Sequence, residues 1–64
     1  MSNIKDLRKA ITDGLTSEVG YIARELHDNG VDIMPMYKHA CTLNKARKGA
    51  WQDIVDVLEE IIIS

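Results

Sequence analysis

The sequence predicts an all-α fold for a single domain over residues 1–64, either a small bundle of three to four helices or a two-helix hairpin. Apolar residues in both halves of the chain recur every three or four positions, which is the spacing of one face of an α-helix. Glycines and a proline divide these patterns into segments. Only Ile61–Ile63 resembles a short strand, and the chain offers no second strand to pair with it.

The first half of the chain carries an apolar stripe whose members are three or four positions apart. These residues are Ile4, Leu7, Ile11, Leu15, Val19, Ile22 and Leu26. Ser2 is a suitable N-cap for a helix that begins here. Gly14 interrupts the stripe, and Thr16 and Ser17, both good capping residues, follow it. The segment is therefore either one long helix weakened at Gly14 and Gly20 or two helices of about 11 residues that meet near Gly14, and we favour the break.

The chain divides again near residues 29–34. Asn29 and Gly30 both tolerate the left-handed conformation that ends many helices. Pro35 suits the first turn of a new helix, where its missing N–H group costs nothing. We therefore expect one helix to end before this segment and another to begin within it.

A second apolar stripe with helical spacing runs through the second half. It consists of Met36, Ala40, Leu43, Ala46, Ala50, Ile54, Val57 and Ile61. Gly49 interrupts this stripe directly after Lys45, Arg47 and Lys48, and cations favour the last turn of a helix. A helix that ends near residue 48, followed by another from residue 50, fits this pattern; the alternative is one helix over 35–62.

The C-terminal part carries more apolar residues than one helix face holds: Trp51, Ile54, Val55, Val57, Leu58, Ile61, Ile62 and Ile63. A chain of this size buries only about 60% of the surface that it exposes when unfolded. We therefore expect a homodimer that covers the surplus. Residues 34–49 contain four basic and no acidic side chains and residues 50–64 four acidic and no basic ones, so antiparallel pairing would bring opposite charges together.

Composition excludes several classes of protein. The chain has no apolar run long enough to span a membrane and no apolar N-terminal core of a signal peptide. A single cysteine cannot form an internal disulfide and fits a reducing compartment. We therefore expect a soluble, cytoplasmic protein. Because the chain begins with Met and ends without a tail, we also expect a complete product, of a size frequent among phage and other accessory proteins.

The segment Met36–Gly49 contains the residue types of a metal or thiol site, but not their usual spacing. His39 and Cys41 are two positions apart, so on a helix they point in different directions, and His27 lies beyond the Asn-Gly break. Cys41 lies beside the apolar stripe, where a free cysteine is usually a packing residue. The glycines match no nucleotide-binding fingerprint. We expect no enzymatic activity, no metal and no cofactor.

A protein partner is the function that we favour from sequence. The turn around Pro35 gathers Ile33, Met34, Met36 and Tyr37, and Met and Tyr are enriched at interfaces. The candidate partner-binding residues are these four together with Trp51, Leu58 and Ile62. Each of them has an alternative role in the core of the bundle. The sequence thus favours a regulatory or inhibitory protein that binds another protein.

Nucleic-acid binding is the alternative function. The candidate contacts are Lys38, Lys45, Arg47 and Lys48, which form a basic face on the predicted helix. The segment around Gly30 matches the helix-turn-helix pattern poorly, because Pro35 would lie in the recognition helix. The formal net charge of −2 gives no strong overall attraction to a polyanion.

Overall fold

The computed structural model describes residues 3–64 and contains four helices and no strand within that range. They are α1 (Ile4–Thr12), α2 (Thr16–Asp28), α3 (Met34–Ala46) and α4 (Gln52–Ile63). The prediction of a small all-α bundle is confirmed, and its two-helix alternative is wrong because the chain turns at both Gly14 and Gly49. The segment 61–63 belongs to α4 and not to a strand.

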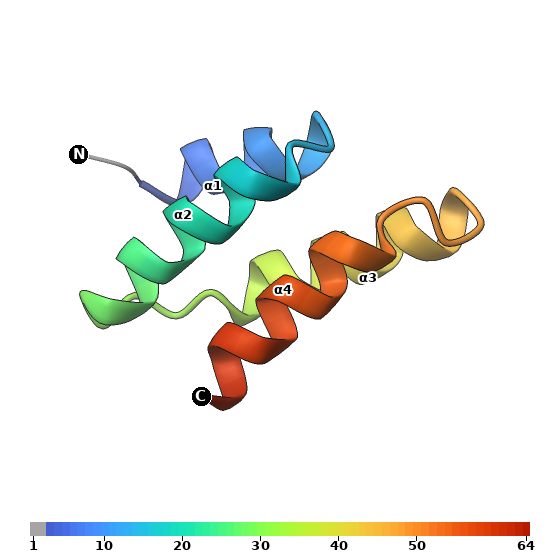
Figure 1. Cartoon of the computed structure of the whole chain (residues 1–64). Helices are drawn as coiled ribbons and strands as arrows, with labels where there is room; N and C mark the ends of the chain where they lie inside the picture. Colours follow the sequence, from blue (N-terminus) through green and yellow to red (C-terminus); the bar gives the residue numbers. More distant parts are fainter. Residues whose placement is uncertain (1–2) are drawn as a thin grey trace.

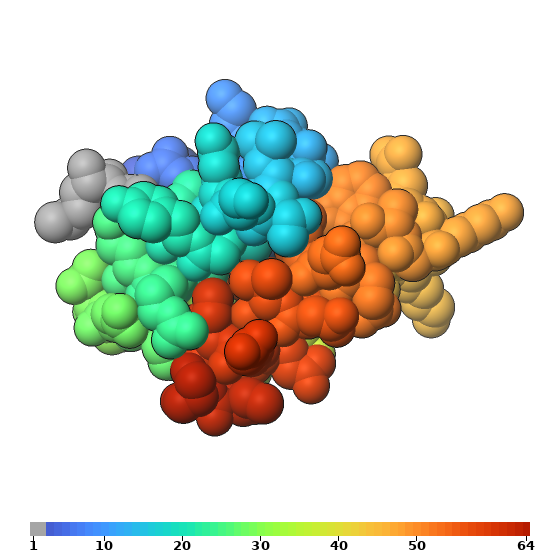
Figure 2. All heavy atoms as spheres, viewed as in Figure 1, coloured from blue at the N-terminus to red at the C-terminus, as the bar shows by residue number. Residues whose placement is uncertain are grey.

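The four helices form two hairpins, α1 with α2 and α3 with α4, which lie against each other (Figure 1). Across the hairpins, α1 packs beside α3 and α2 packs beside α4. Figure 2 shows α2 and α4 side by side on the viewed face. The α1–α2 and α3–α4 turns lie together at one end, which we call the turn end (residues 13–15 and 47–51). The α2–α3 connection (residues 29–33) and the last residues of α4 (60–64) form the other end, which we call the open end.

Gly14 ends α1 by adopting a φ of 72°, a left-handed conformation in which a Cβ atom would be strained. Its N–H donates to the carbonyl of Ile11, and the N–H of Leu15 donates to the carbonyl of Ala10. This pair of bonds is a Schellman motif, which satisfies carbonyls at the helix end. Leu15 consequently leaves the apolar stripe, and 44% of its surface is exposed.

The first helix is capped by Asn3, whose side chain accepts from the N–H groups of Lys5 and Asp6. The Asp6 carboxylate accepts in return from the N–H of Asn3, which completes a capping box. The N-cap predicted at Ser2 lies outside the described residues. Thr16 lies inside the first turn of α2 and does not cap it, because the cap position is occupied by Leu15.

The core of the bundle is entirely apolar within the described range. It consists of Leu7, Ala10, Ile11, Val19, Ala23, Leu26, Ile33, Met36, Ala40, Ile54, Val55, Leu58 and Ile61. Three further apolar residues of the C-terminal part, Trp51, Val57 and Ile62, pack half-buried against this core, and only Ile63 is largely exposed. The folded monomer therefore covers most of the apolar surplus from which we expected a homodimer.

Gly20 of α2 faces Val57 where α2 packs against α4. A Cβ atom on Gly20 would lie 3.4 Å from Cγ1 of Val57. A Cβ atom at this distance would make van der Waals contact with Val57, so α2 and α4 pack closely at this glycine. Among the described residues, none of the helices combines the length and apolarity that crossing a membrane requires.

Candidate functional site

Three of the residues predicted to contact a partner belong to the core. Ile33, Met36 and Leu58 expose only 1%, 8% and 0% of their surface. A side chain without exposed surface cannot contact a partner unless the bundle opens. We therefore no longer assign these three residues to a docking surface, and their role is to hold the α2–α3 connection, α3 and α4 together.

Trp51 is half-buried at the turn end, where it joins the two hairpins. Its indole N–H donates to the carbonyl of Ile11 at the end of α1. Its backbone N–H donates to Oδ1 of Asn44 in α3 at 3.0 Å. The guanidinium carbon of Arg47 lies 5.9 Å from the centre of the indole ring, within range of a cation–π contact. Because these bonds are all within the chain, Trp51 is an anchor of the fold, and it lies at the end of the bundle away from Met34 and Ile62.

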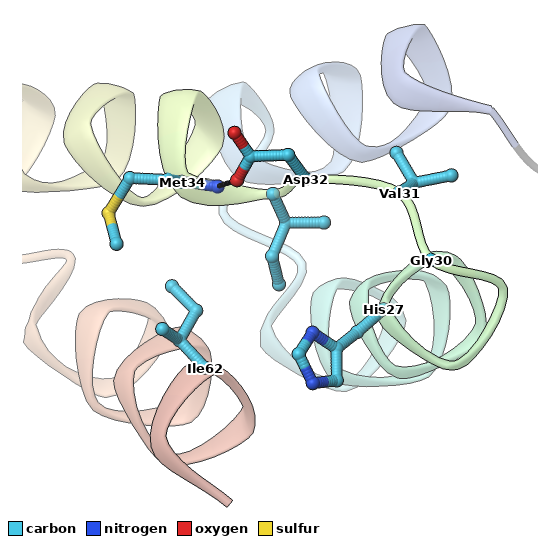
Figure 3. A pocket seen from close by; sticks show the side chains of 7 residues that line it. His27, Gly30, Val31, Asp32, Met34 and Ile62 are labelled. Carbon is cyan, nitrogen blue, oxygen red and sulfur yellow. Dashed lines mark hydrogen bonds between the residues drawn. The ribbon is translucent and has the colours of Figure 1, made fainter.

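The open end contains a surface pocket of about 230 Å³ (Figure 3). It is lined by His27, Gly30, Val31, Asp32, Ile33, Met34 and Ile62. The fold thus brings Met34, from the start of α3, next to Ile62, from the end of α4. The imidazole of His27 closes the pocket from α2.

Exposed apolar side chains gather around this pocket. Of the residues that line it, Val31 and Met34 expose 38% and 37% of their surface. The Asp32 carboxylate accepts from the N–H of Met34 at 3.0 Å, which fixes the start of α3. The pocket therefore has an apolar rim at Val31 and Met34, beside a helix start that is held by a hydrogen bond.

The size and lining of the pocket suit a side chain of another protein. Sites for small organic ligands usually enclose about 300–1,000 Å³, which is more than the roughly 230 Å³ present here. Its walls are mainly apolar, and the polar side chains among its lining residues are those of His27 and Asp32. An apolar anchor residue of a partner would fill the volume without leaving many polar groups unpaired.

Tyr37 lies half-buried between α3 and α4, outside the open-end pocket. Its hydroxyl donates to the Glu59 carboxylate at the long distance of 3.5 Å. The pKa of Tyr37 is raised above its usual value, first by a hydrogen bond with the Cys41 side chain, and then by the negative charges of Cys41 and Glu59. Tyr37 therefore belongs to a polar contact between helices and not to the exposed apolar rim.

The predicted basic face is only partly continuous. Lys38 and Lys45 are seven positions apart in α3, so they lie on the same row of the helix, and both are exposed. Arg47 stacks on Trp51, and Lys48 lies in the α3–α4 turn with a φ of 55°.

The sequence reasoning missed that α1 contributes to this basic surface. Thr12 of α1 lies 3.3 Å from the His39 ring nitrogen of α3, so the exposed side of α1 adjoins the exposed side of α3. Lys5 and Arg8 are exposed on α1. Lys5 and Arg8 are about thirty positions from Lys38 along the chain, so the sequence does not show that they share a surface. The one available signal was the helical spacing, which predicts helices that pack side by side.

The metal-binding residue types are dispersed in the fold. Over residues 3–64, no three His, Cys, Asp or Glu side chains lie close enough together to hold a metal ion. His39 contacts Thr12, whereas Cys41 is next to Tyr37 on the other flank of α3. Comparison of the chain with known protein families, curated proteins and solved structures found no match.

Proposed function

We propose that this chain is a small non-enzymatic regulatory or inhibitory protein that acts by docking on a protein partner through its open end. The observation that supports the proposal is the exposed apolar surface of Val31 and Met34, which line a pocket at that end together with Ile62. Exposed apolar side chains that gather around a pocket are typical of interaction sites.

The chemistry of the rim also favours a protein as the occupant. Met34 is unbranched and can adapt to the shape of a partner. Asp32 and His27 add polar groups beside the apolar surface, which could orient the partner by hydrogen bonds. An apolar side chain of the partner would enter the pocket between Met34 and Ile62.

The homodimer stays a prediction. A stable interface buries about 800 Å² on each partner, which is roughly a fifth of the 4275 Å² surface of this chain. The open end is the place where a second copy would cover exposed apolar side chains. A dimer formed there would compete with a different partner for the same residues.

The test is to capture partners from an extract of the source cells on the immobilised chain, with substitutions at the open end. Met34→Asp and Val31→Asp place a charge on the exposed apolar lining of the pocket and should abolish capture of a stoichiometric partner. Tyr21→Asp is the matched control, because Tyr21 is an exposed apolar residue on α2, away from the open-end pocket. It should leave capture unchanged.

Light scattering of the purified chain over a range of concentrations distinguishes the homodimer. A dimer mass that Met34→Asp converts to a monomer mass would identify a second copy at the open end. A monomer that captures no protein, or captures the same proteins with Met34→Asp as without it, would contradict the proposal.

A further inference from the structure

The fold divides the charges of the bundle between two sides. Helices α1 and α3 with the α3–α4 turn carry seven basic residues and one acidic residue: Lys5, Arg8, Lys9, Lys38, Lys45, Arg47, Lys48 and Asp6. Helices α2 and α4 carry one basic residue and seven acidic ones: Arg24, Glu18, Glu25, Asp28, Asp53, Asp56, Glu59 and Glu60. Because α1 packs beside α3 and α2 beside α4, these sets occupy different sides of the bundle. The overall charge of −2 conceals this division.

The basic side is continuous across the two helices. The contact between Thr12 and His39 places the exposed row of α1 that contains Arg8 next to α3, since Thr12 is one helical turn from Arg8 and its hydroxyl donates to the Arg8 carbonyl. Packed helices lie about 8–10 Å apart, so Arg8 and Lys38 can reach the same extended ligand.

The cations of this side are available to a ligand. Among residues 3–64, Lys5, Arg8, Lys38 and Lys45 are exposed and form no ion pair. The one acidic residue of α1, Asp6, is held in the capping box and faces the groove between α1 and α2. Asp6 therefore lies on the flank of α1 that faces α2, and not on the flank that faces α3.

We propose that the α1–α3 side binds the phosphate backbone of double-stranded nucleic acid, without reading the base sequence. The four exposed cations Lys5, Arg8, Lys38 and Lys45 are the contacts, with Lys48 at the edge. An extended polyanion fits a surface with cations on two neighbouring helices better than a single phosphate does, because several phosphates can be neutralised at once.

The positions of the aromatic residues favour a duplex over a single strand. Proteins that bind single strands stack the bases on exposed aromatic side chains. Tyr37 and Trp51 are half-buried in contacts within the chain, and Tyr21 lies on α2. The α1–α3 side thus offers phosphates their counter-charges and offers bases no stacking surface.

The acidic side does not prevent this binding. The bundle measures 32 × 22 × 18 Å, and charges in 0.1 M salt are screened over about 10 Å. A duplex against α1 and α3 would lie on a different side of the bundle from α2 and α4, which carry most of the carboxylates. The carboxylates of the α2–α4 side repel the phosphates of a duplex, so they favour an approach in which the α1–α3 side faces the duplex.

The experiment is a fluorescence anisotropy titration of a labelled duplex of about two helical turns, with random sequence, at several salt concentrations. Four phosphate contacts predict a slope of log affinity against log salt of about −3.6, hence a loss of about 100-fold between 50 and 200 mM salt. Arg8→Gln and Lys45→Gln should each reduce the slope by about one. Arg24→Gln is the matched control, because it removes the same charge from the α2–α4 side, and it should leave the slope unchanged.

Three results would overturn the inference. One is no change in anisotropy at 50 mM salt. Another is an equal loss of affinity in Arg8→Gln and Arg24→Gln, which would mean that only net charge matters. The third is self-association of the chain without nucleic acid, seen as a mass above that of the monomer, which added salt reverses and Arg8→Gln abolishes. That result would mean that the basic side binds the acidic side of a second copy. Unchanged duplex binding by Met34→Ala would separate this surface from the open end.

Discussion

The two ends of the bundle are built in different ways. At the turn end, Trp51 bonds to Asn44 and Ile11, Asn44 bonds to Gln52 at 3.0 Å, and Gln52 bonds to Asp56 at 2.8 Å. Nearer the open end, the side-chain hydrogen bonds recorded between elements are long, from Arg24 to Ser64 and from Tyr37 to Glu59, both at 3.5 Å. The turn end thus fastens the two hairpins, and the open end keeps apolar surface exposed.

This difference suggests how so short a chain combines stability with a docking surface. A core of this size supplies only about 3–5 kcal/mol, so each anchor at the turn end is a large part of the total. A site whose residues contribute little to stability can be apolar and exposed without endangering the fold. We therefore expect substitutions at the turn end to lower the stability of the fold, and substitutions at the open end to weaken the binding of a partner.

The largest effect should come from Trp51→Ala, which removes the anchor of the turn end. The loss of a mostly packed indole and its hydrogen bond should cost about 3 kcal/mol, enough to unfold much of the population. Trp51→Phe keeps the packing and removes only the N–H donor, so it should cost about 1 kcal/mol. Urea unfolding followed by circular dichroism measures both, and an unchanged midpoint for Trp51→Ala would refute the anchor role.

A pair of methionines in one turn of α3 sharpens the comparison at the open end. Met36→Ala empties a core position and should destabilise the fold by about 2 kcal/mol. Met34→Ala changes a partly exposed rim residue and should cost less than about 0.5 kcal/mol. Thermal unfolding of the two variants side by side provides the measurement. Equal losses would mean that Met34 is a core residue and not part of a docking surface.

A smaller and opposite effect is expected in the α3–α4 turn. Lys48 adopts a φ of 55°, which strains a side chain with a Cβ atom by about 1 kcal/mol. Lys48→Gly should therefore stabilise the chain by up to about 1 kcal/mol, a rise of about 4–8 °C in Tm. Lys45→Gly is the control, because residue 45 is within α3, and there glycine should destabilise by about 1 kcal/mol. A fall in Tm for Lys48→Gly would contradict this prediction.

The smallest effect concerns pH. Since the pKa of Tyr37 is raised above its ordinary value of 10.0, the folded state holds the phenol proton more tightly than the unfolded state does. This contribution is fully present below pH 10.0 and is lost as the pH rises through the folded-state pKa. The stability difference between the wild type and Tyr37→Phe should therefore shrink above pH 10.0 in alkaline denaturant titrations. A difference that is constant with pH would show that the proton of Tyr37 is not linked to folding.

Much of the fold could be predicted from sequence because its signals are local. The spacing of Leu7, Ile11 and Val19 predicts the helices that contain them, and Gly14 adopts the left-handed conformation that ends α1. The cap of α2 could not be predicted in the same way. Thr16 has a suitable side chain, but after the Schellman motif at Gly14 the N-cap position falls on Leu15, so Thr16 is already the first residue of the helix.

The candidate site was harder to predict, because it depends on which residues of different helices meet. Sequence pattern identified Met34 and Ile62 as apolar, but it could not distinguish them from the buried Met36. Their separate roles follow from the direction in which each side chain leaves its helix. The contribution of Arg8 to the basic side depends on the packing of α1 against α3, which is a tertiary contact with no trace in the local sequence.

Trp51 is the only tryptophan of the chain, and its position determines what optical spectroscopy can detect. Tryptophan emission comes from one indole that is fixed to the end of α1 and covered on one face by Arg47. A change in its wavelength or intensity reports separation of the two hairpin turns. A ligand that enters the pocket at the far end, between Met34 and Ile62, would leave the emission nearly unchanged while the fold stays closed. Unfolding and docking thus have separate readouts in the native chain, without an added label.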